Sequence, residues 1–558
     1  MKTSSNKNKI FSIFEVENIL KKQKIISALW IGSSKKYSHY QNFYLPLKKL
    51  FGESILFDPR KVRFSHGSEQ MNKMLFSLVE KEKPDYILVI VGRDELTIET
   101  IEIIKKISPE TKIISLVGDD DTQFETLKRY QGFFVDCNLL AQPNYEKNYW
   151  KEGMKNTFPL VGINTDIFKP MKIKKIYDVT FIGAPSEPRA DIIRFLIDNK
   201  INLKIFGRGW EIYPEFKDFY IGPLETEDMI KVINQTRINL TLSKNTLGVI
   251  HFKGRVFEIP ACKSFSLTDH FKEYLKFFKK DKEIVMFKNK KDLLKKINYY
   301  LKNEKEREKI AENPYKKIIK NHSILVTFKN MFKKVMENEE IFSSKIPIIK
   351  EKIITLKKED IHKNLEGIKN LIKEFDYVSF SDGDSLPLKH KDYLQSYSLE
   401  KTKKEISCCD YYVYNKLLGN YLMVNTHRSF LYFRKDKFDQ LISINQLAVS
   451  KNYFINNLSK FRGFFNGKRI DIINKKNTCF ISIPLIKNRK INKLDYDVFS
   501  YAFQKIFIIE AYSLFKQKKL FRSSYFYRLT YFLVKNPLFM KFFLEFIKDK
   551  QNWNRLRI

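Results

Sequence analysis

The stretch that decides the fold begins with Asp178-Val-Thr-Phe-Ile-Gly183 and closes with Gly254-Arg-Val-Phe-Glu-Ile-Pro-Ala-Cys-Lys-Ser-Phe-Ser-Leu-Thr-Asp269. The first segment predicts a strand that ends in a Gly turn, and a helix-period apolar series follows over 192–197. A second strand with its own Gly turn comes next, Leu203-Lys-Ile-Phe-Gly207. The repeated order of strand, turn and helix predicts a parallel sheet with ligand sites at the carboxyl ends of its strands.

Short motifs follow one another through this stretch. They are Phe181-Ile-Gly183, Arg189, Phe206-Gly-Arg-Gly-Trp210, Arg255-Val-Phe-Glu258, Ala261-Cys-Lys263 and Asp269. In this order they resemble the second domain of group-1 glycosyltransferases of the GT-B type, and among these the CgeB-like, or spore-maturation-protein-like, branch. The resemblance extends over about residues 25–335.

The resemblance implies an α/β fold with two facing Rossmann-like domains, followed here by a smaller α/β and helical C-terminal module. It implies a glycosyltransferase that moves a sugar, with retention of anomeric configuration, from a UDP- or GDP-linked donor. The expected acceptor is a cell-envelope or protein glycan, either lipid-linked or on a protein. No metal is required at the GT-B site. The alternative function is a non-catalytic nucleotide- or glycan-binding scaffold in a glycan assembly complex.

The donor is expected on the second domain. The expected donor-binding residues are Gly183, Arg189, Gly207, Gly222, Arg255 and Glu258. Arg189 opens a helix, where a guanidinium and free helix N–H groups suit a diphosphate, although an Arg in a first turn is often a surface residue. By the resemblance, Glu258 accepts hydrogen bonds from the ribose hydroxyls of the donor.

Two departures from the family pattern favour the scaffold alternative. Ile250 stands where the wider superfamily often has a second Glu, so that His251 or Lys253 must supply the polar contacts there. Lys263 replaces the usual corner Gly, which predicts either backbone strain or a different turn.

The acceptor side should lie on the first domain. Gly118-Asp-Asp-Asp121 follows the predicted strand 112–116, at the strand end where function usually collects. Asp120 and Asp121 are therefore candidate catalytic residues, with a solvated helix cap as the alternative. His39 is the third candidate, because it follows the first strand of the domain, although a lone His is more often structural.

Length and composition limit the other possibilities. A chain of 558 residues with a net charge of +38 should form about three domains and be drawn to anionic surfaces. An AT-rich genome that favours Lys and Asn explains the same charge. Nucleic acid is not an expected partner, because the aromatics lie in apolar strands and helices instead of an interleaved basic platform. Five cysteines without a Cys-x-x-Cys pair, and no long apolar run, predict a cytoplasmic protein, at most peripheral at the inner face of the membrane.

A third module follows the two Rossmann-like domains. Phe375-Asp-Tyr-Val-Ser-Phe380 predicts a strand, and Asp382-Gly-Asp384 follows it, as in GT-A (family-2-like) glycosyltransferases, where such a pair holds Mg²⁺ or Mn²⁺. An ordinary Asx turn is the alternative. The expected parts of the chain are a tail at 1–24, an acceptor-side domain at 25–170, a donor-side domain at 171–342, a Lys-rich linker at 343–361, a partial GT-A-like module at 362–494 and a basic aromatic helical tail at 495–558.

Overall fold

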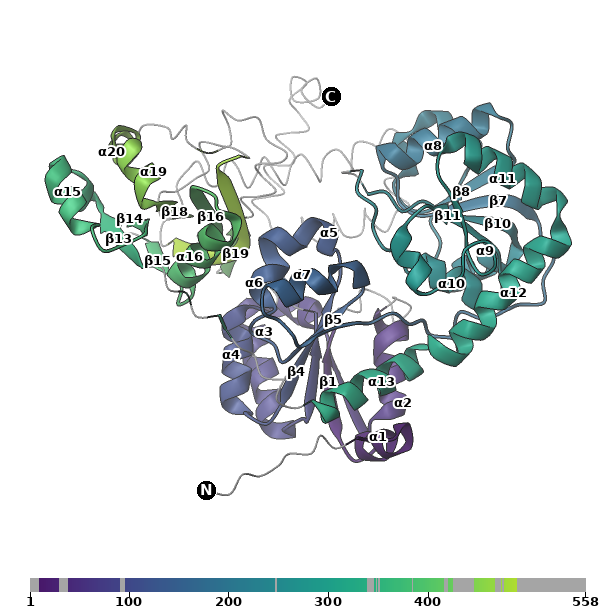
Figure 1. The fold of residues 1–558 in the computed structure, drawn as a ribbon. Helices are drawn as coiled ribbons and strands as arrows, with labels where there is room; N and C mark the ends of the chain where they lie inside the picture. Colours follow the sequence, from purple (N-terminus) through teal and green to yellow (C-terminus); the bar gives the residue numbers. More distant parts are fainter. Residues whose placement is uncertain are drawn as a thin grey trace. The chain divides into compact units, whose positions relative to one another are not determined.

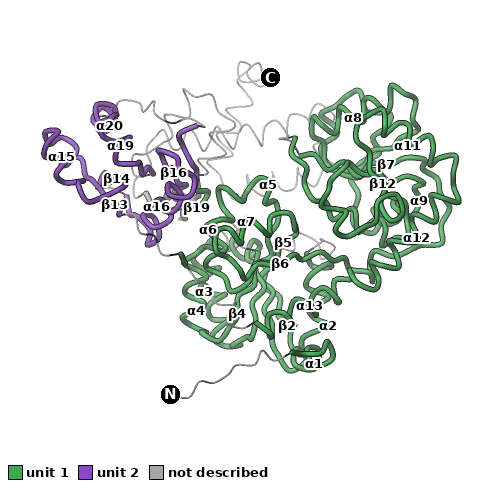
Figure 2. The backbone as a smooth tube through the Cα atoms, viewed as in Figure 1, with its two compact units in different colours: residues 1–350, 481–483 green, residues 351–480, 484–558 purple. Residues whose placement is uncertain are grey.

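The chain divides into two compact units, residues 1–350 with 481–483 and residues 351–480 with 484–558 (Figure 2). The computed structural model describes residues 10–29, 39–90, 96–245, 248–338, 346–347, 349, 352–383, 385–415, 420–424, 446–466, 473 and 476–488. Residues 1–9 of the tail expected at 1–24, and the whole tail expected at 495–558, therefore lie outside the described residues.

The first domain of unit 1 is built on a parallel six-stranded sheet with the order β2-β1-β3-β4-β5-β6 (Figure 1). Its strands are β1 Lys24–Ala28, β2 Glu53–Phe57, β3 Tyr86–Val89, β4 Lys112–Val117, β5 Cys137–Leu140 and β6 Thr157–Pro159. Its main crossover helices are α3 Pro59–Glu82 and α4 Ile98–Ile107. The apolar face of α4, with Ile98, Ile101 and Ile104, is buried, as its helical spacing predicts.

The second domain of unit 1 has its own parallel six-stranded sheet, with the order β12-β11-β10-β7-β8-β9. Its strands are β7 Tyr177–Ile182, β8 Leu203–Phe206, β9 Tyr220–Gly222, β10 Thr236–Thr241, β11 Ser266–Asp269 and β12 Val285–Phe287. Its main helices are α8 Glu187–Asp198, α9 Thr226–Gln235, α10 Arg255–Ala261, α11 Lys290–Lys302 and α12 Glu304–Asn321. The strand order reverses between β7 and β10, so that a ligand crevice is expected at their carboxyl ends.

The chain crosses between the two domains twice, first near residue 170 and again near residue 323, where it returns to the first domain. Ile163 and Ser323 form a parallel bridge, after which helix α13, Ile324–Glu337, packs on the first domain. Phe328 and Phe332 of α13 are fully buried in the core of that domain, and the Phe332 ring lies 5.0 Å from the ring of Tyr86. The end of the predicted donor-side range 171–342 therefore packs with the acceptor-side sheet.

Unit 2 contains a mixed sheet with the order β13-β14-β18-β16-β19-β15, and β17 pairs with β16. Its strands are β13 Ile353–Lys357, β14 Tyr377–Ser381, β15 Ser385–Pro387, β16 Ile406–Asn415, β17 Asn420–Val424, β18 Leu447–Ser450 and β19 Thr478–Asn488. Its helices are α14 Lys358–Ile361, α15 Leu365–Leu371, α16 Lys391–Thr402, α19 Lys451–Asn456 and α20 Leu458–Phe465.

The linker predicted at 343–361 needs a correction. Strand β13 and helix α14 occupy its second half, and β13 pairs in parallel with β14. Leu356 and Ile361 are buried in the core of the unit, whereas Lys357 and Lys358 point outward. Two of the lysines that suggested a linker, Lys357 and Lys358, are thus exposed residues of a strand and a helix.

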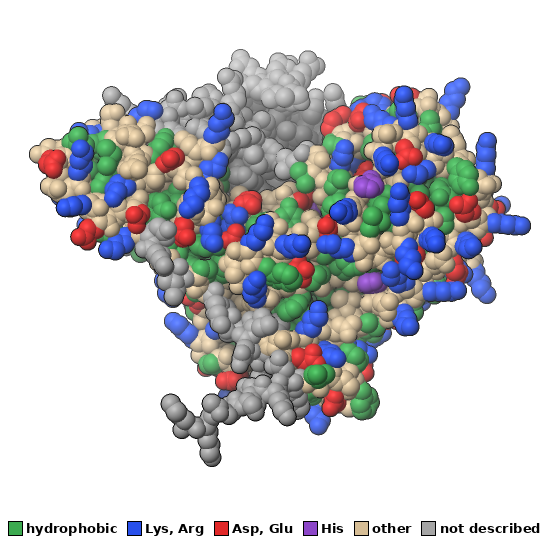
Figure 3. Space-filling view, in the orientation of Figure 1, with side chains coloured by type: hydrophobic (Ala, Val, Ile, Leu, Met, Phe, Trp, Pro, Cys, Tyr) green, Lys and Arg blue, Asp and Glu red, His purple; other side chains and the backbone are tan. Residues whose placement is uncertain are grey.

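Lys and Arg side chains are scattered over the face of the molecule that Figure 3 shows, with Asp and Glu between them. This view agrees with a charge excess that is spread along the sequence. Among the described residues, no helix combines the length and the apolar character needed to cross a membrane. All five cysteines are buried.

Candidate functional site

Arg189 lies in the first turn of α8, directly after the Gly turn that ends β7. Its Nη1 donates a hydrogen bond of 2.7 Å to the carbonyl oxygen of Ala184, and its guanidinium lies 5.9 Å from the ring centre of Phe181. Its Nε is buried and has no hydrogen-bond partner among the described residues. Burial lowers the pKa of Arg189, and the nearby charge of Asp269 partly opposes this effect. The side chain is a mostly buried cation with spare donor capacity.

Lys253 brings a second cation to the same place from the loop that precedes α10. Burial, followed by the charge of Arg189, lowers the pKa of Lys253 to about 8, although Asp121 and Asp119 act in the opposite direction. No ion pair or hydrogen bond of its ammonium group is seen in the described parts of the chain. Two half-buried cations that repel each other would be stabilised by an anion placed between them.

The predicted glycines occupy the carboxyl ends of adjacent strands. The amide of Gly183 donates to Phe206 O at 2.9 Å, and the amide of Gly207 donates to Gly222 O at 3.0 Å. Gly207 has a φ of +129°, and a Cβ there would lie 2.3 Å from Gly183 O. The Trp210 indole donates to the same oxygen at 2.7 Å. These glycines let three strand ends meet closely, beside Arg189.

Arg255 and Glu258 face each other in the first turns of α10. Arg255 Nη1 lies 2.6 Å from Glu258 Oε2, and each side chain is about one-fifth exposed. The carboxylate expected to accept ribose hydrogen bonds is thus ion-paired within its own helix. At the end of α10, Lys263 has a φ of +51°, so that the corner keeps the left-handed conformation usual for Gly with a Lys in its place.

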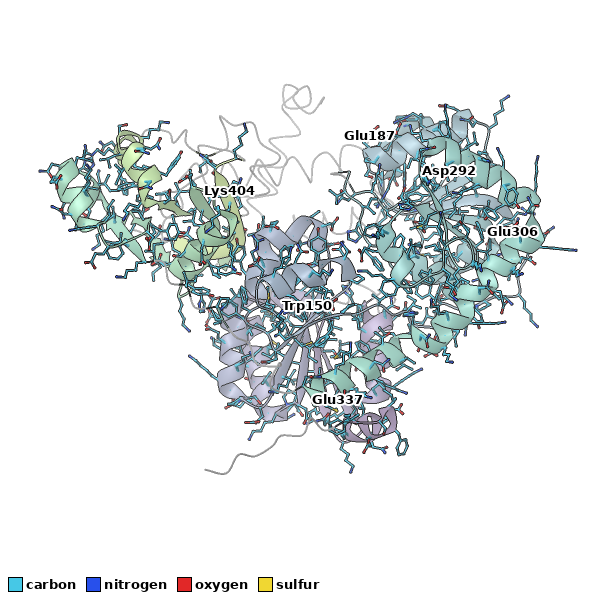
Figure 4. The ribbon with its side chains drawn as sticks, viewed as in Figure 1. Trp150, Glu187, Asp292, Glu306, Glu337 and Lys404 are labelled. Atoms are coloured by element: carbon cyan, nitrogen blue, oxygen red, sulfur yellow. The ribbon has the colours of Figure 1, made fainter. Side chains whose placement is uncertain are left out.

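A pocket of about 560 Å³ lies beside Arg189, since its lining includes Pro188, which directly precedes Arg189. It lies at the carboxyl ends of β11 and β12, between the starts of α8 and α11, which Glu187 and Asp292 mark in Figure 4. Its lining residues are Pro188, Asp191, Ile192, Lys244, Ile250, Asp269, His270, Phe287, Lys288, Asn289 and Lys290. None of the six predicted donor residues lines it, but Asp269 does, and the charge of Asp269 acts on Arg189.

The acidic trio lies at the carboxyl end of β4 in the first domain, where the sequence predicts it. Asp119 is exposed and left-handed with a φ of +56°, and helix α5, Asp120–Gln123, begins after it. Asp120 is 1% exposed, and its Oδ1 accepts a hydrogen bond of 2.8 Å from the Tyr149 hydroxyl. Burial raises the pKa of Asp120 to about 6, although Tyr149 and Lys128 oppose the shift.

We expect Asp120→Asn to raise the free energy of unfolding at pH 8 by about 1–3 kcal/mol, because the folded chain must otherwise hold a buried carboxylate that has lost its proton. The folded pKa of Asp120 lies above its unfolded value, so the carboxyl group favours folding at low pH, and this contribution is lost as the pH rises through about 6. The advantage of the variant should therefore vanish near pH 4. Thermal unfolding of both proteins from pH 4 to 8 measures it, with the exposed Asp119→Asn as control. A difference that does not change with pH would contradict this assignment.

Asp121 reaches the second domain. Its Oδ1 lies 2.8 Å from His251 Nδ1, and its Oδ2 accepts a hydrogen bond of 2.5 Å from Asn245. Gln142, from the first domain, lies 3.4 Å from Asp121 Oδ1 and 3.2 Å from His251 Nδ1. The Asp121 side chain is 2% exposed and that of His251 is 16% exposed. Asp121 of the first domain therefore forms one polar cluster with Asn245 and His251 of the second domain.

Between β10 and α10, residues 243–245 pair with residues 249–251, and Asn245 and His251 both contact Asp121. Lys244 and Ile250 form an antiparallel bridge, and the amide of His251 donates to Ser243 O at 3.0 Å. The sequence analysis offered His251 or Lys253 in place of the missing Glu, but it did not identify Asn245 or Gln142, because neither residue belongs to a motif.

His39, the third candidate catalytic residue, directly precedes the π-helical turn Tyr40–Tyr44, and its ring lies 5.8 Å from that of Phe43.

Two groups of side chains carry the oxygen or nitrogen atoms that a metal ion needs. Asp119, Asp121 and His251 bring ligand atoms within 4.8 Å of one another. However, His251 Nδ1 is hydrogen-bonded to Asp121 Oδ1, and Asp121 Oδ2 accepts a hydrogen bond from Asn245. These ligand atoms therefore already have partners within the protein. In unit 2, Asp382 Oδ1 accepts the Ser385 amide at 3.1 Å, as in an Asx turn, and Asp384 lies outside the described residues.

Residues 189–332 match a family model described as "Glycosyl transferase-like". The second domain is a glycosyltransferase domain. A curated relative, spore protein CgeB of Bacillus subtilis (strain 168), is 22% identical over 265 residues, which are 43% of this chain and 80% of that protein. These findings confirm the resemblance to the GT-B type, CgeB-like branch.

Two solved structures are among those similar to this chain. A glycosyltransferase from Rickettsia africae ESF-5 is 12% identical, with a TM-score of 0.42 over 57% of this chain and 99% of its own. The Anabaena protein HepE, in complex with UDP and glucose, is 9% identical, with a TM-score of 0.43 over the same shares. The two parallel sheets and the third mixed sheet confirm the predicted fold class.

Proposed function

We propose that the chain transfers a sugar from a nucleotide-sugar donor, and that Arg189 and Lys253 bind the donor diphosphate. The observation that carries this proposal is the pair of half-buried cations at the carboxyl ends of β7 and β10, which have no carboxylate partner of their own among the described residues. The strand order of the sheet reverses at this point, where ligands of parallel sheets usually bind. The adjoining pocket of about 560 Å³ has the size of a small-molecule site and receives the nucleoside or the sugar.

The two cations have a chemical task as well as a binding task. When the bond between the sugar and the diphosphate breaks, negative charge grows on the leaving oxygen. Guanidinium and ammonium groups that are already in place stabilise this charge without reorganisation. Glu258 has a charged partner in Arg255, and its carboxylate oxygens can accept hydrogen bonds from the ribose hydroxyls at the start of α10.

The acceptor follows from the resemblance and from the charge of the chain. We propose a cell-envelope or protein glycan, presented from the side of the Asp121 cluster, and a cytoplasmic enzyme that is peripheral at the inner face of the membrane. A net charge of +38 favours approach to an anionic surface. The basic aromatic range 495–558, which suggested this surface, lies outside the described residues.

Donor affinity should fall about 10-fold or more as the pH rises from 7 to 9.5, because Lys253 loses its proton near pH 8 and a charge-assisted hydrogen bond contributes about 1.5–3 kcal/mol. Calorimetric titration with UDP-glucose, UDP-N-acetylglucosamine and GDP-mannose measures the affinity, and donor hydrolysis in the same samples measures turnover. Lys253→Met should bind weakly at every pH, whereas the exposed Lys217→Met should behave as the wild type does.

Each result of this titration has a defined meaning. Binding with hydrolysis supports the transferase, and binding without hydrolysis of any donor supports the scaffold alternative. Binding whose affinity is the same at pH 7 and pH 9.5 would remove Lys253 from the diphosphate site. Failure to bind any of the three donors would contradict the proposed function.

A further inference from the structure

His251 meets Asp121 in a way that fixes which ring nitrogen carries hydrogen. An ionised carboxylate only accepts hydrogen bonds, so the 2.8 Å contact between Asp121 Oδ1 and His251 Nδ1 requires a hydrogen on Nδ1. The Gln142 amide then has only Asp121 Oδ1 left to donate to. In a neutral ring the lone pair is consequently on Nε2, which has no hydrogen-bond partner among the described residues.

Asp121 is held in its charged form. Burial raises its pKa, but hydrogen bonds from His251 and Asn245 and the charge of Lys253 outweigh burial, and the pKa is lowered overall. The carboxylate is 2% exposed, so water screens its charge weakly. A buried carboxylate at Nδ1 holds the ring in one orientation and stabilises the positive charge that the ring gains when Nε2 takes up a proton.

We propose that His251 is the general base of the transfer and that Asp121 is its positioning residue, an inference that rests on the proposed glycosyl transfer. The acceptor oxygen forms a bond to the anomeric carbon while its proton passes to His251 Nε2. The bond between the anomeric carbon and the donor phosphate oxygen breaks, and its electron pair leaves with the diphosphate. The proton is later released to water, so that atoms and charges balance.

A side-chain base has a stereochemical consequence. Base-assisted direct displacement at the anomeric carbon inverts its configuration. In a retaining front-side attack the leaving diphosphate itself can take the proton, and a base with a dedicated carboxylate is unnecessary. The Asp121–His251 pair therefore points to inversion, in contrast to the retention that the family resemblance implies.

Charged groups of both domains surround the His251 ring. Asp121 and Asp119 face it from the end of β4, and Lys253 follows it on its own loop. The charge of Asp121 acts on Asp120 and Tyr145 within the first domain, and Arg189 acts on Lys253 from α8. Asp120 has a pKa of about 6, so Asp120→Asn is included in the experiment.

The experiment follows hydrolysis of the donor that the wild type cleaves fastest, chosen from UDP-glucose, UDP-N-acetylglucosamine and GDP-mannose, between pH 5 and 9. His251→Asn keeps an amide that can donate to Asp121 but has no basic nitrogen. Its kcat should fall about 100-fold or more, with little change in KM, and the acidic limb of the rate profile should disappear. Asp121→Asn should lose a comparable factor, because the ring is no longer held in the required tautomer. The exposed His362→Asn is the matched control.

The wild type itself gives a second test that does not depend on any variant. Methanol replaces water as the nucleophile, and the proton NMR spectrum of the methyl glycoside shows whether its anomeric configuration is opposite to that of the donor, as we expect. Retention would overturn the proposal, as would wild-type kcat in His251→Asn. So would an acidic limb that survives in His251→Asn and disappears in Asp120→Asn. If the wild type binds and cleaves no donor, the proposed function fails first, whereas cleavage that is indifferent to His251 refutes this inference alone.

Discussion

Arg189→Ala should lower kcat for donor cleavage about 100-fold and raise KM much less, since removal of one preorganised donor to a developing oxyanion typically reduces kcat by about 10²–10³. The guanidinium is held by Ala184 O and by the ring of Phe181, so it is in place before the donor arrives. Its contribution should therefore be greatest where the leaving diphosphate gains charge. Steady-state hydrolysis with the best donor separates the two constants.

Arg194→Ala is the matched control for this experiment. Arg194 lies on the same helix α8, but it is exposed and paired with Glu187 and Glu215. Its removal takes away the same charge from α8 without reaching the carboxyl ends of the strands. Equal kinetics of Arg189→Ala and the wild type would exclude Arg189 from the site. Equal losses in both variants would indicate a general effect of charge on the helix.

The parallel sheets could be predicted from the sequence because their signals are local. A buried strand, a Gly turn and an amphipathic helix each leave a pattern within about 15 residues, and the same order recurs along the second domain. The glycines were predictable for the same reason. Gly207 is required by a positive φ and by the approach of one backbone to another, both of which demand the absence of a side chain.

Features that depend on distant parts of the chain could not be predicted in this way. Nothing in the sequence of α13 indicates that Phe328 and Phe332 pack on a sheet some 200 residues earlier instead of on the adjacent one. The link between Asp121 and Asn245 joins residues 124 positions apart through single hydrogen bonds, which leave no periodic pattern. Strand β13 was not predicted because the exposed Lys352, Lys357 and Lys358 at its two ends gave this stretch the composition of a linker.

The same distinction applies to the candidate site. Arg189, Asp120 and Asp121 were named from their positions after strands, and the carboxyl end of a parallel strand is a position that the sequence does predict. The pairing of Glu258 with Arg255 follows from a spacing of three residues on a helix, and the sequence could have shown it. The choice of His251 over Lys253 as the partner of Asp121 depends on the antiparallel pairing of Lys244 with Ile250, which no motif specifies.

Gly207→Ala should destabilise the second domain by about 4 kcal/mol, from backbone strain of about 1–3 kcal/mol at a φ of +129° together with overpacking of about 1–3 kcal/mol. The new Cβ would lie 2.3 Å from Gly183 O and 2.7 Å from Gly183 C, which are backbone atoms that cannot turn aside. Gly222→Ala is the matched control, because Gly222 has a φ of +138° but nothing within 4 Å of its Cβ position, so only the strain should appear. Thermal unfolding of both variants separates the two contributions, and equal destabilisation would mean that the Gly183 turn can move away. In that contrary case the start of α8 would be displaced as well, and Gly207→Ala would lose donor binding at Arg189 while Gly222→Ala keeps it.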